Sequence, residues 1–267
     1  MSETLALVGA GVMGQTLLGG LLRAGRDPRG IVVVDRRTGR GEELHERFGV
    51  RVVADVAEVA AAATVVLAVK PQDTGDLLDS LAPHLAPGAL VVSLAAGITT
   101  AFCEARLRPG TAVVRVMPNT PSLVDEGMAA LAGGSACSAA DLALAESLLR
   151  SCGRTAVLAE KHLDAVTALS GSGPAYVFYV VEAMVEAGVL LGLPRVTATE
   201  LVVQTVVGAG AMLRETGQHP SVLREQVTSP AGTTAAALRQ LDSSGVRAAL
   251  VSAVEAAWSR SRQLSGS

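Results

Sequence analysis

Residues 4–14 read TLALVGAGVMG, an aliphatic run followed by glycines at the spacing GxGxxG, and this stretch decides the fold. The aliphatic run is typical of a buried strand, and an apolar helix is predicted from the glycines to Ala24. Gly9 permits a tight turn, Gly11 lets a phosphate group approach the backbone, and Gly14 allows helix and strand to pack closely. Because the motif lies between a strand and a helix, it predicts a dinucleotide-binding unit of the Rossmann type.

A second aliphatic run, residues 31–34, ends at Asp35, where units of this type contact the adenosine ribose. Asp35 on its own favours NAD(H), because a carboxylate accepts hydrogen bonds from the ribose hydroxyls and repels a 2′-phosphate. Arg36, Arg37 and the hydroxyl of Thr38 favour NADP(H), because these groups bind a phosphate. We therefore predict NADP(H) as the cofactor, with NAD(H) as the alternative if the two arginines are only solvated surface residues.

Aliphatic runs continue along the first half of the chain and alternate with helical or turn patterns. They lie at residues 51–53, 64–69, 90–93, 112–116, 128–131 and 156–158, and a further helix is predicted at 139–151. This alternation predicts an α/β fold with a mostly parallel sheet covered by helices on both faces. Loops at the carboxyl ends of the strands form the dinucleotide crevice, so Lys70, Gly97 and Asn119 are predicted to face the cofactor. Ordinary turn chemistry is the alternative for these residues, and for Pro71 it is at least as strong.

Strand patterns stop near Glu160, and we place the domain boundary there: residues 1–160 form the NAD(P)-binding domain and residues 161–267 an all-α domain. One helix is predicted from the SGSGP run to Leu191 and the next at 197–215. The second of these helices is apolar on nearly all sides and must be buried, which so short a helical domain cannot do alone. A subunit interface is the favoured explanation, and the centre of a monomeric bundle is the alternative.

The helical half contains the run VTSPAGTTAAAL, residues 227–238, which has the pattern of a helix N-terminus. Ser229 can cap the helix, Pro230 suits its first position, and the next amides then lack partners inside the helix. Such a helix end binds a small anion, and threonine hydroxyls beside it can donate or accept hydrogen bonds. We predict a carboxylate pocket here, and an ordinary Ser-Pro helix start is the alternative. The pocket is predicted to comprise Ser229, Ala231, Gly232, Thr233 and Thr234.

The composition excludes several classes of protein. The chain of 267 residues is 49% hydrophobic and 18% charged, which predicts a globular protein with a substantial core. A net charge of −3 and few aromatic residues argue against binding to nucleic acid. The sequence shows no charged leader and no apolar run of about 18 residues, so neither export nor a membrane span is predicted. The three cysteines lack CxxC spacing and the four histidines lack helical pairing, so we predict no metal site and a cytoplasmic location.

Considered together, the motifs of the chain resemble those of the pyrroline-5-carboxylate reductase family over essentially the whole length. The resemblance rests on the runs GAGVMG, AVKPQ, SLAAGIT, RVMPNTP, LSGSGPAYVF, AGVLLGLPR, VTSPAGTTAAALRQLD and VRAALVSAVEAAWSR. It implies an NAD(P)H-dependent oxidoreductase that reduces 1-pyrroline-5-carboxylate to L-proline, the last step of proline biosynthesis. It also implies a Rossmann domain followed by a helical domain that builds homodimers, which assemble further, often into decamers.

The resemblance also assigns roles to the residues that match the family's motifs. The implied cofactor residues are Val8, Gly9, Ala10, Gly11, Val12 and Met13 at the pyrophosphate, Arg36 and Asp55 at the adenosine end, Ala68, Val69, Lys70 and Pro71 at the nucleotide bridge, and Ala95, Ala96 and Gly97 at the nicotinamide half. The implied substrate residues are Ser229, Thr233 and Thr234, with Glu160 close by and Gln226 nearer the cofactor. Two departures bear on these roles: Asp35 and Asp55 stand where the family often has neutral residues, and Ala231 replaces a common glycine, which a backbone-amide contact tolerates.

Reduction of an imine needs a hydride at carbon, a proton at nitrogen and a group that holds the carboxylate. No histidine or lysine stands out as the acid, and Thr234 is our candidate proton donor, with water or the iminium proton of the substrate as alternatives. The first alternative function is a 3-hydroxyacid dehydrogenase-like enzyme, which by resemblance would carry Lys and Asn on the helix at 174–191, where neither occurs. The second is a non-catalytic NADP-binding protein, which would have no use for the pocket at 229–234.

Overall fold

The computed structural model describes residues 4–37 and 39–265. They divide into two compact units, of which the second is Gly173–Ala256 and the first contains the described residues on either side of it. The end of the last helix belongs to the first unit, where Ser261 donates a 2.7 Å hydrogen bond from its hydroxyl to Asp164. This division falls after the boundary predicted near Glu160. A functional boundary between the two domains at Glu160 stays a prediction.

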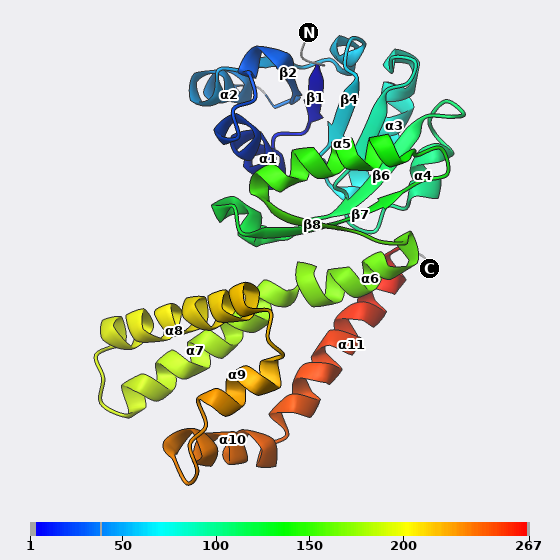
Figure 1. Ribbon diagram of the computed structural model, residues 1–267. Helices are drawn as coiled ribbons and strands as arrows, with labels where there is room; N and C mark the ends of the chain where they lie inside the picture. Colours follow the sequence, from blue (N-terminus) through cyan, green and yellow to red (C-terminus); the bar gives the residue numbers. More distant parts are fainter. Residues whose placement is uncertain (1–3, 38, 266–267) are drawn as a thin grey trace. The chain divides into compact units, whose positions relative to one another are not determined.

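Eight strands of the first unit form one sheet in the order β3-β2-β1-β4-β5-β6-β7-β8 (Figure 1). The strands are β1 (Leu5–Val8), β2 (Ile31–Val34), β3 (Arg51–Val53), β4 (Thr64–Leu67), β5 (Leu90–Ser93), β6 (Ala112–Met117), β7 (Gly127–Gly133) and β8 (Gly153–Val157). Strands β1 to β6 are parallel, β7 is antiparallel to β6, and β8 runs parallel to β7. The predicted mostly parallel sheet is confirmed, and its order reverses at β1 and β4, where such sheets open a crevice.

Helices cover both faces of this sheet, because alternate residues of each strand point to opposite sides. The helices of the first unit are α1 (Val12–Arg23), α2 (Arg40–Phe48), α3 (Thr74–Leu81), α4 (Thr100–Glu104), α5 (Ala139–Leu149) and α6 (Leu163–Val166). Leu5 and Leu7 of β1 belong to a core cluster with α1, α2 and α5, whereas Ala6 and Val8 belong to one with α3 and α4. The strands are therefore anchored from both sides, which fixes the position of the loops at their carboxyl ends.

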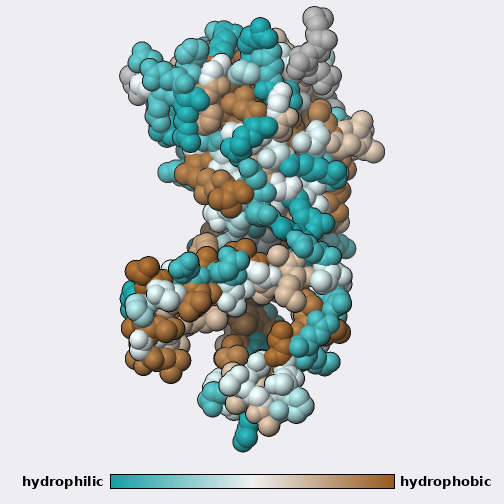
Figure 2. Space-filling view, turned by 60° about the vertical axis from the view of Figure 1, so that its left-hand side comes forward, coloured by the Kyte–Doolittle hydropathy of each residue, from teal (hydrophilic) through white to brown (hydrophobic). Residues whose placement is uncertain are grey.

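The second unit consists of helices whose apolar side chains are largely exposed in a single chain. They are α7 (Gly173–Leu190), α8 (Arg195–Thr216), α9 (Pro220–Gln226), α10 (Thr233–Ser243) and the first part of α11 (Val246–Ser265). Among the described residues of α7 and α8, only Val185 and Ala198 are buried, while Phe178 is 66% and Leu190 is 87% exposed. Figure 2 shows this hydrophobic surface gathered on the helices. The alternative of a monomeric bundle with buried central helices is therefore wrong.

Two helical stretches, Glu160–Leu190 and Arg195–Thr216, are long and apolar enough by length and composition to cross a membrane. The prediction that no stretch reaches this measure needs correction. Glu182 and Glu186 interrupt the apolar run of α7, but an 18-residue window of the stretch still has a mean hydropathy of 1.3. Length and composition do not separate a lipid-facing helix from one that packs on another protein surface, because both expose apolar side chains in an isolated chain.

Candidate cofactor and substrate sites

A cavity of about 590 Å³ opens at the carboxyl ends of β1, β2 and β4, where the strand order reverses. The predicted cofactor residues that line it are Val8, Gly9, Ala10, Gly11, Asp35, Arg36, Arg37, Ala68, Val69 and Lys70. It is also lined by residues that were not predicted: Val34, Val56, Gln72, Asp73, Asp76 and Leu77. Gln72 belongs to the AVKPQ run, and the last three lie at or just before the start of α3, which follows β4 at the crevice. The conventional strand order of such a sheet, which puts the segment after β4 at the crevice, could have identified these residues from the sequence.

The glycine turn has the geometry that a dinucleotide needs. Gly9 has a φ of +96°, and a Cβ there would lie 2.8 Å from the carbonyl oxygen of Ala68. A Cβ on Gly14 would lie 2.2 Å from the carbonyl oxygen of Gly9, whereas a Cβ on Gly11 would meet nothing within 4 Å. Two of the glycines therefore allow strand, turn and helix to pack, and the third leaves open space at the cavity for a ligand's phosphates. The residues present fit a dinucleotide.

Helix α1 presents its N-terminus at this cavity without a side-chain cap, because its N-cap residue is Gly11. Val12 at the first helical position is 69% exposed. Gln15 donates from Nε2 to the carbonyl oxygen of Ala10 at 2.8 Å, which ties the turn to the helix. The first amides of α1 have no partners inside the helix, and with the helix dipole they make a site for an anion such as a pyrophosphate.

Asp35 and Arg37 form a bidentate ion pair beside the glycine turn. Arg37 donates from Nε to Oδ1 at 2.9 Å and from Nη2 to Oδ2 at 2.5 Å. These hydrogen bonds lower the pKa of Asp35 to about 2, so its carboxylate is ionised at neutral pH. Arg36 also lines the cavity, but it is exposed and makes no ion pair within the described part of the chain. Thr38, which was predicted to assist the arginines, lies outside the described residues.

Other predicted cofactor residues do not line this cavity; they are Val12, Met13, Gly14, Asp55, Pro71, Ala95, Ala96, Gly97 and Asn119. Met13 packs against the core, and Asp55 accepts a 2.9 Å hydrogen bond from the amide of Ala57. Asn119 accepts one from the amide of Met128 at 2.8 Å and donates to Ser170. Gln226 lies in the second unit, where it donates to the side chain of Gln218. Contact between any of these residues and a cofactor stays a prediction.

Glu160 is predicted to lie close to the substrate, and the structure shows its carboxylate bound within the first unit. Its Oε1 accepts from the amide of Thr100 at 2.7 Å, and its Oε2 accepts from the Thr100 hydroxyl at 2.6 Å. Arg115, which is 6% exposed, lies on β6 with its Nη1 3.2 Å from Oε1. These contacts join the start of α4 to the segment that follows β8. Glu160 therefore has a structural role, and its contact with substrate stays a prediction.

The N-terminus of α10 starts later than predicted. The helix begins at Thr233 with Gly232 as its N-cap, so Ser229 does not cap it and Pro230 is not its first residue. Instead these residues form a β-turn, closed by a 3.0 Å hydrogen bond from the amide of Gly232 to the carbonyl oxygen of Ser229. Pro230 occupies the second position, which prolines favour in such turns. The amides that lack partners inside α10 are thus those of Thr233, Thr234 and Ala235, and the amide of Gly232 is not free.

The turn also explains the two small residues before α10. Ala231 has a φ of +57°, in the left-handed region that favours glycine. An alanine there costs about 1 kcal/mol relative to glycine, so the replacement that a backbone-amide contact is predicted to tolerate still carries a conformational cost. A Cβ on Gly232 would lie 2.2 Å from the hydroxyl oxygen of Ser229. A side chain at Gly232 would therefore force the Ser229 hydroxyl to rotate away, and it would also lie 3.2 Å from the Ser229 carbonyl oxygen.

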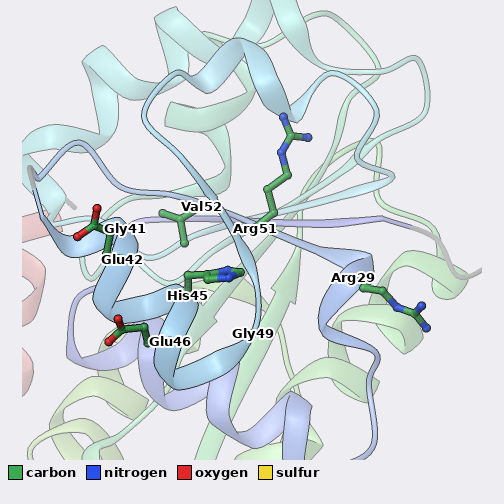
Figure 3. Close-up of a pocket in the computed structure, with 8 residues that line it drawn as sticks. All are labelled: Arg29, Gly41, Glu42, His45, Glu46, Gly49, Arg51 and Val52. Carbon is green, nitrogen blue, oxygen red and sulfur yellow. The ribbon is translucent and has the colours of Figure 1, made fainter.

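A second cavity, of about 650 Å³, lies at α2 and β3 (Figure 3). Figure 3 shows Glu42 and Glu46 projecting from α2, whereas Arg29 and Arg51 extend from separate segments. The ring nitrogen Nδ1 of His45 lies 2.9 Å from the carbonyl oxygen of Val50, so the histidine is engaged locally. The side chains carry charges of both signs, and although α2 begins here without a side-chain cap, Glu42 and Glu43 in its first turn disfavour an anion. The first cavity remains the candidate cofactor site.

Comparisons with known proteins identify relatives of both halves of the chain. Residues 160–264 match the family model for pyrroline-5-carboxylate reductase dimerisation, and residues 4–97 match that for NADP oxidoreductases, coenzyme F420-dependent. Pyrroline-5-carboxylate reductase of Corynebacterium melassecola is 45% identical over 98% of each chain, and that of Escherichia coli strain K12 is 37% identical over the full length of both.

Solved structures give the same result for the fold. The pyrroline-5-carboxylate reductase of Coxiella burnetii superposes with a TM-score of 0.95 at 37% identity over 99% of each chain. The Plasmodium falciparum pyrroline carboxylate reductase, solved with NADP bound, gives a TM-score of 0.87 at 29% identity over 98% of each chain. Neither alternative, a 3-hydroxyacid dehydrogenase-like enzyme or a non-catalytic NADP-binding protein, matches these relatives. The chain therefore belongs to the pyrroline-5-carboxylate reductase family.

Proposed function

We infer that this chain reduces 1-pyrroline-5-carboxylate to L-proline with a hydride from NAD(P)H, in the last step of proline biosynthesis, and that NADPH is its preferred donor. The observation that carries the cofactor preference is the exposed Arg36 at the cavity of the glycine turn. Asp35, the residue that would repel a 2′-phosphate, has its charge compensated by Arg37. A relative solved with NADP bound supports the same preference.

The residues of the first cavity have distinct roles in this proposal. When bound, the cofactor supplies the hydride. The free amides at the start of α1 hold its pyrophosphate, and Gly11 gives the phosphates access to the backbone. Arg36 holds the 2′-phosphate, and Lys70, which follows β4, adds a second positive charge to the lining of the cavity. Asp73 and Asp76 line the same cavity and disfavour negative groups at the start of α3.

The N-terminus of α10 holds the substrate in this proposal. The carboxylate of the imine accepts hydrogen bonds from the free amides of Thr233, Thr234 and Ala235, since Gly232 as N-cap contributes no side-chain cap. The hydroxyl of Thr234 donates a proton to the imine nitrogen as the hydride reaches carbon, and solvent water returns a proton to the threonine oxygen. Fixing the substrate by its carboxylate orients its carbon toward a bound hydride donor, which in well-oriented systems lowers the barrier by about 7 kcal/mol or more.

The assembly is proposed to be a cytoplasmic homodimer that joins into a larger oligomer, up to a decamer. The match of residues 160–264 to a dimerisation model supports the dimer, as do the exposed apolar side chains of α7 and α8. On this proposal the two helices that could cross a membrane by composition face a second copy of the chain, not lipid. Cys103, Cys137 and Cys152 are free thiols, in keeping with a reducing compartment.

Replacing Arg36 with alanine is expected to weaken NADPH binding about 10- to 30-fold, because a charge-assisted hydrogen bond to the 2′-phosphate is lost. NADH carries no such phosphate, so its dissociation constant should change by no more than about twofold on the same scale. Fluorescence titration of both cofactors measures the effect. Arg154→Ala is the matched control, because Arg154 is exposed on β8, at the far end of the sheet. Equal losses of affinity for NADPH and NADH would show that Arg36 does not bind the 2′-phosphate.

At micromolar concentration the protein is expected to have at least twice the mass of one chain, which is 27.1 kDa. The physical reason is that one copy of the chain exposes many apolar side chains on its helices, Leu190 and Phe178 among them. A contiguous exposed apolar surface of this kind marks a site of association with another protein. Sedimentation equilibrium measures the mass without calibration by shape. A single species of one-chain mass would refute the dimer, and a dimer that does not grow would refute only the larger oligomer.

A further inference from the structure

The carboxylate of Asp35 is saturated with hydrogen bonds. Its Oδ1 accepts from the backbone amide of Arg37 at 3.0 Å and from Arg37 Nε at 2.9 Å. Its Oδ2 accepts from Arg37 Nη2 at 2.5 Å and from the backbone amide of Ala10 at 3.1 Å. A carboxylate offers about four lone-pair positions, and donors already occupy that number. The side chain of Asp35 is 4% exposed, although its residue lines the cavity.

The same pair also holds the glycine turn. Arg37 donates from Nη2 to the carbonyl oxygen of Ala10 at 3.1 Å, while the amide of Ala10 donates to Asp35. Both polar groups of Ala10 are thus bound to the pair, which sets the turn against the end of β2. The pKa of Asp35, lowered to about 2 chiefly by the side chain of Arg37, keeps the pair charged at any pH near neutrality.

An acidic residue at the end of the second strand serves NAD(H) by accepting hydrogen bonds from the ribose hydroxyls. Asp35 stands at that position but has no acceptor position left, because Arg37 and Ala10 fill all of them. We propose that Arg37 is a specificity-determining residue that acts by masking Asp35, so that the ribose 2′-hydroxyl of NAD(H) finds no acceptor. This inference rests on the proposed use of a nicotinamide dinucleotide. It adds a second cause to the proposed preference for NADPH, because Arg37 neutralises the charge of Asp35 and Arg36 can then bind the 2′-phosphate.

Arg37 could instead serve only as a second ligand of the phosphate, and the two roles differ in one measurable respect. If Arg37 masks Asp35, removing Arg37 changes how much the ribose 2′-hydroxyl contributes to binding affinity. If Arg37 only binds the phosphate, that contribution stays the same. ADP-ribose and 2′-deoxy-ADP-ribose isolate this difference, because neither carries a 2′-phosphate or a nicotinamide. Calorimetric titration gives both dissociation constants without any measurement of turnover.

The wild-type protein is expected to bind the two probes with dissociation constants within about twofold of each other. Arg37→Ala frees the carboxylate of Asp35, so ADP-ribose should then bind about tenfold more tightly than the deoxy probe, as one hydrogen bond to a charged group predicts. Adding Asp35→Asn to Arg37→Ala removes the charged acceptor and should return the ratio most of the way to the wild-type value. The amide of Ala10 keeps a partner oxygen in all of these proteins, which favours retention of the turn.

A tenfold preference of the wild-type protein for the 2′-hydroxyl would overturn the proposal, as would an unchanged ratio in a folded Arg37→Ala variant. Circular dichroism establishes the folding of the variants, and if Arg37→Ala does not fold, the wild-type ratio decides alone. Failure of the proposed NADPH preference would appear separately, as equal binding of NADP⁺ and NAD⁺ by the wild-type protein. That comparison does not enter the ratio of the two probes.

Discussion

Replacing Gly14 with alanine is expected to destabilise the protein by about 3 kcal/mol and to lower Tm by roughly 6–12 °C. The added Cβ would lie 2.2 Å from the carbonyl oxygen of Gly9 and 3.3 Å from the Cβ of Ala68. A backbone carbonyl cannot move aside as a flexible side chain can, so the turn itself must shift away from α1. A shift of about 1 Å in a positioning element can cost ~100-fold, and NADP⁺ binding should fall by that order.

Gly11→Ala is the matched control, because it adds the same methyl group to the same turn. A Cβ at Gly11 meets nothing within 4 Å, and its φ of −70° is allowed for any residue. We expect an unchanged Tm but a marked loss of NADP⁺ affinity, because the methyl group occupies the open space at the cavity. Differential scanning calorimetry and NADP⁺ titration separate the two effects. A Gly14→Ala variant with the wild-type Tm would contradict the packing role, and wild-type affinity in Gly11→Ala would contradict the phosphate site.

The part of the structure that could be predicted from the sequence is the part that depends on local patterns. Continuous aliphatic runs are buried on both faces in a parallel sheet, so each strand can be recognised without its neighbours. Gly9 and Gly14 could be assigned because a tight turn and close helix packing need glycine at fixed spacing. Asp35 and Arg36 could be placed at the cavity because the end of the second strand adjoins the glycine turn in this topology.

The contacts of the charged side chains could not be predicted, because they depend on pairing between residues that have several partners in reach. The sequence placed Asp35, Arg36 and Arg37 side by side, but only the structure shows that Arg37 binds Asp35 and that Arg36 makes no ion pair among the described residues. In the same way the Glu160 carboxylate is bound to Thr100 and Arg115, which lie far from it in the chain. The pairings of Glu160 follow from tertiary packing, which leaves no periodic signal, whereas Asp35 has two neighbouring arginines and the sequence does not say which of them it binds.

The start of α10 shows a third reason why prediction fails. A Ser-Pro pair suits both a helix start and the first half of a β-turn, so residues alone do not separate the two. The positive φ of Ala231 decides for the turn, and it occurs at a residue type that rarely adopts it. The helix start therefore offers different amides: those of Thr233, Thr234 and Ala235 in place of the predicted Ala231, Gly232 and Thr233, and the anion site stays a prediction.

Thr234→Val is expected to lower kcat for imine reduction at least about tenfold while leaving NADPH affinity nearly unchanged. Valine keeps the β-branched shape of threonine and replaces the hydroxyl with a methyl group, so the main change at the start of α10 is the loss of the hydroxyl. Loss of one neutral hydrogen bond costs about 0.5–1.5 kcal/mol, whereas loss of proton transfer adds a further ~100-fold. A fall near tenfold would therefore indicate a hydrogen bond to substrate, and one near a thousandfold would indicate proton donation.

Thr233→Val is the matched control, because Thr233 is the preceding residue of the same helix start and is exposed where Thr234 is half-buried. It keeps the backbone amide that holds the carboxylate, so its kcat should stay within about threefold of the wild-type value. Thr234→Ser retains the hydroxyl and should recover most of the activity. Steady-state kinetics with saturating NADPH measures kcat for each variant. If Thr234→Val reduces the imine at the wild-type rate, Thr234 is only a helix-start residue, and the proton on the imine nitrogen comes from water or is already present in the iminium form of the substrate.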